Sequence, residues 1–195
     1  LIHNPFMHQL SRDIGRYSPN TRFVEVYFVD SGTGAIDSTS YAGIYVLMDR
    51  IEVGKDRVDA GTLEPENLTL PSLSGGYLMK IDRLDPGDSG IFAANQTVAL
   101  VDPREDQLKL PARAAQLNYI RNYLTSFGNA LYDNNRFTNP VTGFRAYIDT
   151  GSWVDHHLLN VLSFNVDALR LSAFFHKKRE GKIHFGPIWD FDRTL

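Results

Sequence analysis

Two carboxylates, Asp190 and Asp192, stand near the end of the chain, directly behind a mostly apolar run at residues 185–188. In an extended chain, side chains two residues apart lie on one face, so both acids are predicted to point the same way. Paired carboxylates hold a divalent cation and, through it, phosphate groups. A purely structural interpretation has one acid capping a turn and the other paired with Arg193 or a lysine. The local pattern alone leaves both interpretations open.

Asp167 lies between a predicted helix and a predicted hairpin, and Asp190 follows that hairpin. The hairpin could bring the two acids close together. Taken alone, an acid at such a junction more often forms a turn than a catalytic site. A functional interpretation of Asp167 therefore depends on its pairing with Asp190.

Lys80 ends a predicted strand that a glycine pair opens. A lysine in this place could reach a nucleotide phosphate as a point charge. Asp49, at the end of an earlier predicted strand, could hold that lysine in an ion pair or lie on the surface. His156 and His157 are adjacent and point in different directions on a helix, so we reject a joint zinc site there.

Strands are predicted through most of the first half. Residues 23–29 and 41–48 alternate apolar and β-branched side chains and are predicted to pair as a hairpin, the second strand being buried on at least one side. Residues 54–74 have no clear period and are predicted to cross the surface as an ordered excursion. Residues 75–82 and 96–101 are predicted to be a third and a fourth strand.

Helices are predicted to dominate the second half. After Pro111, apolar residues recur every three or four positions and predict an amphipathic helix. Ser152 with Asp155 resembles a capping box and predicts a helix through about residue 164. Residues 169–176 and 182–188 are predicted to form a β-hairpin that ends at the acid pair. The spacing that predicts the first helix involves Leu117, Ile120, Leu124, Phe127 and Leu131.

These elements predict an α+β fold, with a sheet-rich first half followed by helices and a β-hairpin. We divide it into a sheet-rich, N-lobe-like part at residues 1–105 and a helical, C-lobe-like part at residues 106–195. Such a layout could form two lobes around a cleft.

The 195-residue chain is 43% hydrophobic and 22% charged, which is typical of a globular protein that buries a core. Its formal net charge of −3 argues against a nucleic-acid partner. The lack of cysteine excludes disulfides, thiolate zinc sites and cysteine nucleophiles. No stretch approaches the roughly 18 apolar residues of a membrane span, so none is predicted in this chain.

Residues 188–195, which read Ile-Trp-Asp-Phe-Asp-Arg-Thr-Leu, resemble the first motif of haloacid-dehalogenase-type phosphatases. In that family an apolar strand leads to Asp-x-Asp-x-Thr. The motif normally opens its doubly wound domain, so a phosphatase would need its whole core beyond Leu195. We therefore rank this interpretation last.

A longer resemblance runs through most of the chain. Five blocks in order are similar to the CotH family, which is named for a spore-coat protein and regarded as atypical protein kinases with a kinase-like fold. Residues 41–51 are similar to its Tyr-x-Gly-x-Tyr-x-Leu-x-Glu-x-Ile block. Residues 165–167 and 187–192, which read Asn-Val-Asp and Pro-Ile-Trp-Asp-Phe-Asp, resemble its Asn-x-Asp and Ile-Pro-Trp-Asp-x-Asp motifs. The other two blocks are residues 22–27 and 75–80.

The resemblance implies transfer of the γ-phosphate of ATP to a hydroxyl group of a protein substrate, assisted by Mg²⁺ or Mn²⁺. By position, Asp167 is implied to be the catalytic acid that orients the acceptor hydroxyl. Asp190 is implied to hold the metal, with support from Asp192. Lys80 and Asp49 are implied to belong to the nucleotide site.

The chain also departs from the family pattern. Ser172 stands where an Asn is a plausible second metal ligand, and serine is a weaker ligand. Asp49 stands where Glu is usual, which shortens the reach of an ion pair with Lys80. An upstream basic segment that the family would use on nucleotide phosphates is absent, so we expect the chain to be part of a longer protein.

An alternative function is a non-catalytic, kinase-like scaffold or adhesion module that keeps the fold without turnover. The resemblance further implies an extracellular, cell-surface or spore-coat location in a bacterium. The acceptor protein is not specified by these residues.

Overall fold

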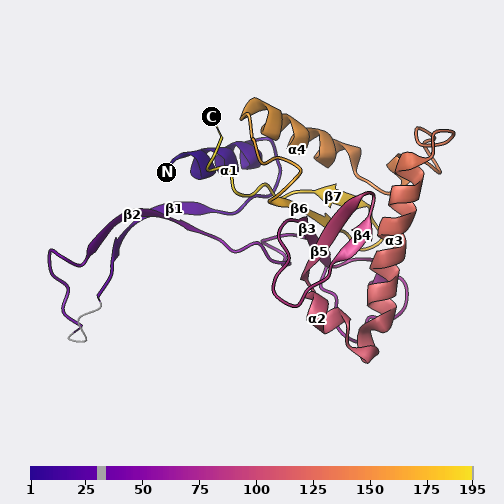
Figure 1. The fold of residues 1–195 in the computed structure, drawn as a ribbon, viewed down its shortest axis with the longest axis horizontal. Helices are drawn as coiled ribbons and strands as arrows, with labels where there is room; N and C mark the ends of the chain where they lie inside the picture. Colours follow the sequence, from indigo (N-terminus) through magenta and orange to yellow (C-terminus); the bar gives the residue numbers. More distant parts are fainter. Residues whose placement is uncertain (30–33, 195) are drawn as a thin grey trace.

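The structure is a computed structural model that describes residues 1–29 and 34–194. Its fold is α+β, as predicted, with a five-stranded antiparallel sheet of order β4-β5-β3-β6-β7 and a separate two-stranded hairpin, β1-β2 (Figure 1). The helices are α1 (His3–Asp13), α2 (Glu105–Leu108), α3 (Ala114–Tyr132) and α4 (Thr150–Leu162), with short 3₁₀ turns at Ser72–Ser74, Pro111–Arg113 and Phe144–Ala146. The strands are β1 (Thr21–Tyr27), β2 (Tyr41–Met48), β3 (Tyr77–Ile81), β4 (Ile91–Ala93), β5 (Gln96–Asp102), β6 (Ala173–Lys177) and β7 (Ile183–Phe185).

Strand β3 lies at the centre of the five-stranded sheet, between β5 and β6. Because successive side chains of a strand point to opposite faces, Tyr77 and Met79 join the core beneath α3, whereas Leu78 packs in a second cluster with Phe174. Lys80 shares the face of Leu78. The sheet takes strands from both sides of the predicted boundary between residues 105 and 106, and the division into two parts stays a prediction.

Helix α3 confirms the predicted amphipathic helix. Ile120, Leu124 and Phe127 are buried on its inner face, at 0%, 3% and 7% exposure. Leu117 and Leu131 pack against the same core while remaining partly exposed. Burial of this apolar stripe fixes the helix against the sheet.

The β1-β2 hairpin confirms the predicted pairing, with Thr21 opposite Met48 and Val24 opposite Tyr45. The predicted burial of residues 41–48 is wrong, since none of them is buried. The hairpin projects from the body of the protein as an arm, and no layer covers it among the described residues (Figure 1). The alternating residue pattern of the arm therefore reflects pairing between β1 and β2 and not burial against a third element.

The N-terminus of helix α4 lies three residues before the predicted one, which had Ser152 as the N-cap. Its N-cap is Asp149, whose Oδ1 accepts a hydrogen bond from Ser152 N at 2.8 Å. Asp155 instead forms an ion pair with Arg16 at 2.6 Å. The capping-box interpretation of residues 152 and 155 is therefore wrong.

The predicted hairpin before the acids is confirmed as β6 and β7, but both strands are shorter than predicted. Leu169 and Ser172 have φ angles of 66° and 55°, in the left-handed region that a strand cannot adopt. Gly186, with φ 110°, ends β7 before a proline. The residues on either side of the hairpin are therefore turns and loops.

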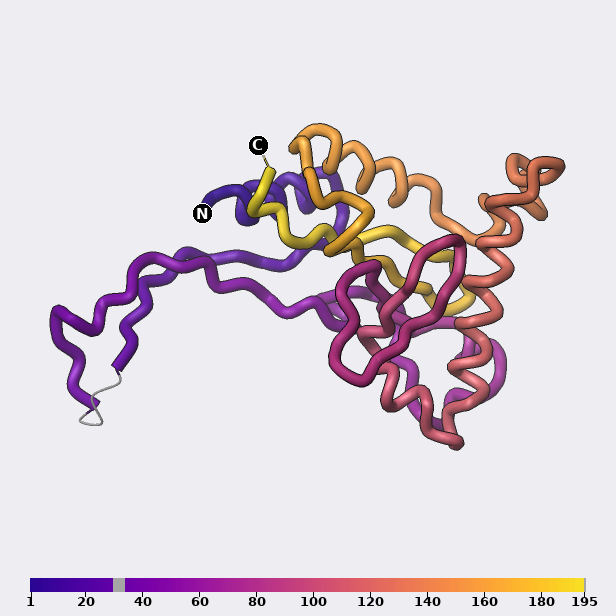
Figure 2. Tube along the Cα trace, viewed as in Figure 1, coloured from indigo at the N-terminus to yellow at the C-terminus, as the bar shows by residue number. Residues whose placement is uncertain are grey.

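Helix α1 lies beside the last residues of the chain, so the two ends of the described structure are neighbours (Figure 2). Met7 of α1 forms one buried cluster with Ile188 and Phe191. Within the described residues, no helix combines the length and the apolar composition needed to cross a bilayer.

Candidate functional site

The structure brings the two predicted metal-binding acids together, although not through an extended strand. Strand β7 ends at Phe185, and Asp190 adopts the left-handed conformation with φ 60°. Partial burial raises the pKa of the Asp190 carboxyl, and the charge of Asp192 and a side-chain hydrogen bond with it raise the pKa further. Ser172 Oγ donates to Asp190 Oδ2 at 3.2 Å. Three of the predicted site residues therefore converge.

A third acid, Asp82, completes the surroundings of Asp190 and was missed in the sequence. Its charge also raises the pKa of Asp190. Lys80 Nζ lies 3.8 Å from Asp82 Oδ2. The two residues are separated by one position at the end of β3, so the same-face rule for strands was the signal that could have found Asp82.

Lys80 and Asp82 line a cavity of about 280 Å³ on the face of the sheet away from α3. Trp189, the residue before Asp190, forms part of its wall. Arg50 and Arg104 add positive charge to the same wall, and Asp85 and Asp88 add negative charge. The cavity therefore combines cations from three segments with the segment that carries the acid pair.

Asp49 contacts residues other than Lys80. Asp49 Oδ2 is 2.8 Å from Arg57 Nη1 and accepts a hydrogen bond from Asn20 Nδ2 at 2.8 Å. These contacts, that of Arg57 foremost, lower the pKa of the Asp49 carboxyl. The structure pairs Lys80 with Asp82 and does not bring Asp49 to it, so a nucleotide role for Asp49 stays a prediction.

Asp167 is positioned from the end of α4. Asn160 Oδ1 accepts from Asn165 Nδ2 at 2.8 Å, and Asn165 Oδ1 accepts from the backbone N of Asp167 at 3.1 Å. The side chain of Asn165, and not that of Asp167, therefore makes the side-chain hydrogen bond of this turn.

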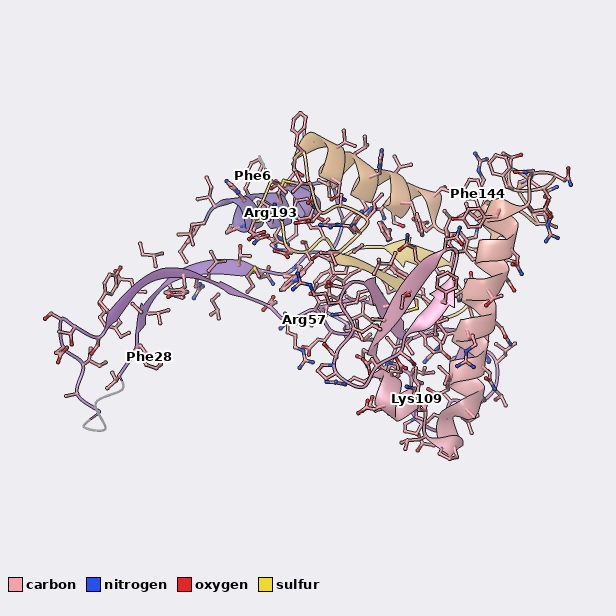
Figure 3. The ribbon with its side chains drawn as sticks, in the orientation of Figure 1. Phe6, Phe28, Arg57, Lys109, Phe144 and Arg193 are labelled. Atoms are coloured by element: carbon pink, nitrogen blue, oxygen red, sulfur yellow. The ribbon has the colours of Figure 1, made fainter. Side chains whose placement is uncertain are left out.

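Two arginines clasp the Asp167 carboxylate. Arg170 donates to Oδ1 at 2.6 Å and Arg193 donates to Oδ2 at 3.2 Å. The hydrogen bond from Arg170 and the two positive charges lower the pKa of Asp167. Arg193 belongs to the segment after Asp192 and lies beside α1 (Figure 3). The loop of Asp167 and the segment of Asp190 are thus joined by the Arg193–Asp167 and Ser172–Asp190 contacts.

The oxygen atoms at the acid pair fit a hard divalent cation. Mg²⁺ is commonly bound by one or two carboxylates, with waters and substrate phosphates completing its coordination. Asp190 and Asp192 supply two carboxylates, and Ser172 supplies a hydroxyl. Across residues 1–29 and 34–194, no group of three or more His, Cys, Asp or Glu is arranged to hold a metal by itself.

The burial of His156 in the core argues against a zinc site shared with His157. It is 5% exposed, and burial lowers its pKa to about 3. Asn160 Nδ2 lies 3.0 Å from its Nδ1. The ring is a satisfied core group in α4.

Comparisons with known proteins place the whole chain in a family. No curated protein and no solved structure gave a significant match. The family described as CotH kinase protein matches residues 1–195, the full length of the chain. The longer of the two resemblances in the sequence is thereby confirmed, and the chain belongs to the CotH kinase family.

Proposed function

We propose that this protein transfers the γ-phosphate of ATP to a hydroxyl group of a protein substrate and that its fold is kinase-like. The observation that carries the proposal is the convergence of Asp190, Asp192 and Ser172 beside a cavity lined by Lys80 and Asp82. Phosphoryl transfer needs mainly positioning and neutralisation of charge. This set of side chains supplies both, and the family membership agrees with it.

Each residue has a proposed role. Asp190 and Asp192 would hold Mg²⁺ with help from Ser172; when bound, the cation neutralises phosphate charge. Lys80 would contribute a second positive charge from β3. Asp167, whose pKa is lowered by its arginine contacts, would accept a hydrogen bond from the acceptor hydroxyl and orient it.

The test is transfer of labelled γ-phosphate from ATP, in the presence of Mg²⁺ or Mn²⁺, to the protein itself or to an added protein. We expect Asp167→Asn and Asp190→Asn each to reduce transfer by about 100-fold or more, because each removes a charge used in positioning. Asp106→Asn is the control, since Asp106 is an exposed acid on α2. Transfer that persists in both site variants would overturn the proposal.

A non-catalytic scaffold is the second candidate, and the clasp on Asp167 favours it. Both carboxylate oxygens already accept hydrogen bonds from guanidinium groups, which compete with an acceptor hydroxyl. Titration of ATP and Mn²⁺ by calorimetry separates the two candidates. Absence of both transfer and metal-dependent ATP binding would leave the scaffold as the better interpretation.

A further inference from the structure

Helix α1 contacts the segment that carries the acid pair through its first turn. Asn4 Oδ1 accepts a hydrogen bond from the backbone N of Phe191 at 2.6 Å, and His3 Nδ1 donates to the backbone O of Asp192 at 3.0 Å. One turn later, Met7 is fully buried in a cluster with Phe191. Figure 2 shows the helix and the end of the chain side by side. Residues from opposite ends of the sequence thus meet at the candidate site.

The backbone of Phe191, the residue between the two acids, is fixed at both of its polar groups. Phe191 is 2% exposed, so its N–H has little access to water and needs a partner within the protein. Asn4 supplies the acceptor for that N–H. Thr194 Oγ1 donates to the carbonyl oxygen of Phe191 at 2.7 Å.

The conformation held in this way is an uncommon one. Asp190 has φ 60°, and a non-glycine residue in the left-handed region persists only when its surroundings hold it there. The hydrogen bond to Asn4 is made by the residue that directly follows Asp190. Loss of that bond would leave a buried N–H unpaired, and the segment would relax toward a conformation in which the N–H reaches another acceptor.

We propose that Asn4 is a positioning residue for the acid pair: its side-chain oxygen holds the Phe191 amide and thereby keeps Asp190 and Asp192 directed at one cation. The inference rests on the proposed function, because it assigns the cation to these two acids. Asn4 acts through the backbone and makes no contact with the cation. Partners of this kind, one step removed from a metal ligand, typically contribute 10-fold to 100-fold in metal affinity.

Three variants of the full chain test the proposal. Asn4→Leu keeps the approximate size of the side chain and removes the acceptor, whereas Asn4→Asp keeps an acceptor oxygen. Gln9→Leu makes the same change as Asn4→Leu at an exposed position of α1, where the side chain contacts Asp13 and Arg12. The readouts are Mn²⁺ affinity by calorimetry and amide hydrogen exchange at Phe191 in the metal-free protein.

We expect Asn4→Leu to weaken Mn²⁺ binding by about 10-fold or more and to accelerate exchange of the Phe191 amide. Asn4→Asp should retain slow exchange and bind Mn²⁺ at least as tightly as the wild type, and Gln9→Leu should match the wild type in both readouts. A folded Asn4→Leu protein with wild-type Mn²⁺ affinity would overturn the proposal. Equal losses in Asn4→Leu and Asn4→Asp would also overturn it, because the acceptor would then be irrelevant.

The two proposals fail in different ways. If the wild type binds no Mn²⁺, the metal-dependent function is wrong and the positioning role falls with it, even if Phe191 exchange depends on Asn4. If the wild type binds Mn²⁺ and transfers phosphate but Asn4→Leu does both equally well, only the role of Asn4 is wrong.

Discussion

At the scale of single residues, the candidate site depends on side chains whose ionisation is set by their neighbours. Partial burial and the nearby Asp192 raise the pKa of Asp190, whereas the arginine clasp lowers the pKa of Asp167. The pKa values of Asp190 and Asp167 are therefore shifted in opposite directions. Asp190 takes up a proton at higher pH than an isolated aspartate does, whereas Asp167 stays ionised to lower pH.

This difference predicts the pH dependence of cation binding. A protonated Asp190 binds a cation poorly, so Mn²⁺ affinity should fall as the pH decreases through the raised pKa of Asp190. Asp192→Asn removes the neighbouring charge and should lower that pKa, which moves the loss of affinity to lower pH while weakening binding overall. Calorimetric titrations between about pH 4 and 7 measure this. An unchanged pH midpoint in Asp192→Asn would contradict the coupling of the two acids.

Part of this site could be predicted from the sequence. The types and spacing of Asp190 and Asp192 left a cation site and a structural role open. The family resemblance favoured the cation site and implied roles for Asp167 and Ser172. The contact of Asn4 with Phe191 could not be predicted, because no local pattern connects residues at opposite ends of a chain. The left-handed conformation of Asp190 was equally hidden, since the apolar run before it favoured a longer strand.

At the scale of elements, the helix with a long apolar period was predicted correctly, whereas the burial of the alternating strand β2 was not. The pattern of α3 was readable because its apolar face packs on the sheet. The β1-β2 arm also carries apolar side chains but has no covering layer among the described residues, with Phe28 70% exposed and Leu47 61% exposed. Phe28 is marked on the arm in Figure 3. Apolar alternation therefore predicts a strand, but it does not show whether another element covers that strand.

The contact between α3 and the β4-β5 turn predicts an unusual glycine effect. Glycine to alanine in a helix normally stabilises by about 1 kcal/mol. At Gly128, however, a Cβ would lie 2.8 Å from Ala94 N, and the turn at Ala94 and Asn95 is held with φ 51° and 59°. Gly128→Ala should therefore destabilise the protein by about 1–3 kcal/mol.

Chemical denaturation measures this effect. The matched control is Ser126→Ala, an exposed position on the same helix, which should change the free energy of unfolding by less than about 0.5 kcal/mol. A stabilising Gly128→Ala would show that the turn moves away from α3 at little cost.

At the scale of the whole molecule, the five-stranded sheet joins the two parts into which the sequence was divided. Strand β3 pairs with β5 from the first part and with β6 from the second. The core beneath α3 likewise combines Tyr77 with Phe175 and Ile183. Neither part has a complete sheet without the other.

Separate expression of residues 1–105 and 106–195 tests this dependence. We expect each fragment alone to lack a cooperative unfolding transition, because each loses the strands and core that the other supplies. The full chain should unfold with one main transition of the sheet and α3. Circular dichroism and calorimetry measure both. Cooperative unfolding of either isolated fragment would instead establish it as an independent domain.

Lys80 of β3 and Phe174 of β6 face each other in one antiparallel ladder. The strand that carries the candidate phosphate-binding lysine and the hairpin that leads to the acids therefore cannot swing apart as rigid bodies without breaking main-chain hydrogen bonds. Under the proposed function, a nucleotide would therefore have to enter and leave past residues outside this ladder, such as Trp189, Asp85 and Asp88 in the cavity wall. The sheet would then stay rigid, and opening and closing of the cavity would depend on the residues around its edges.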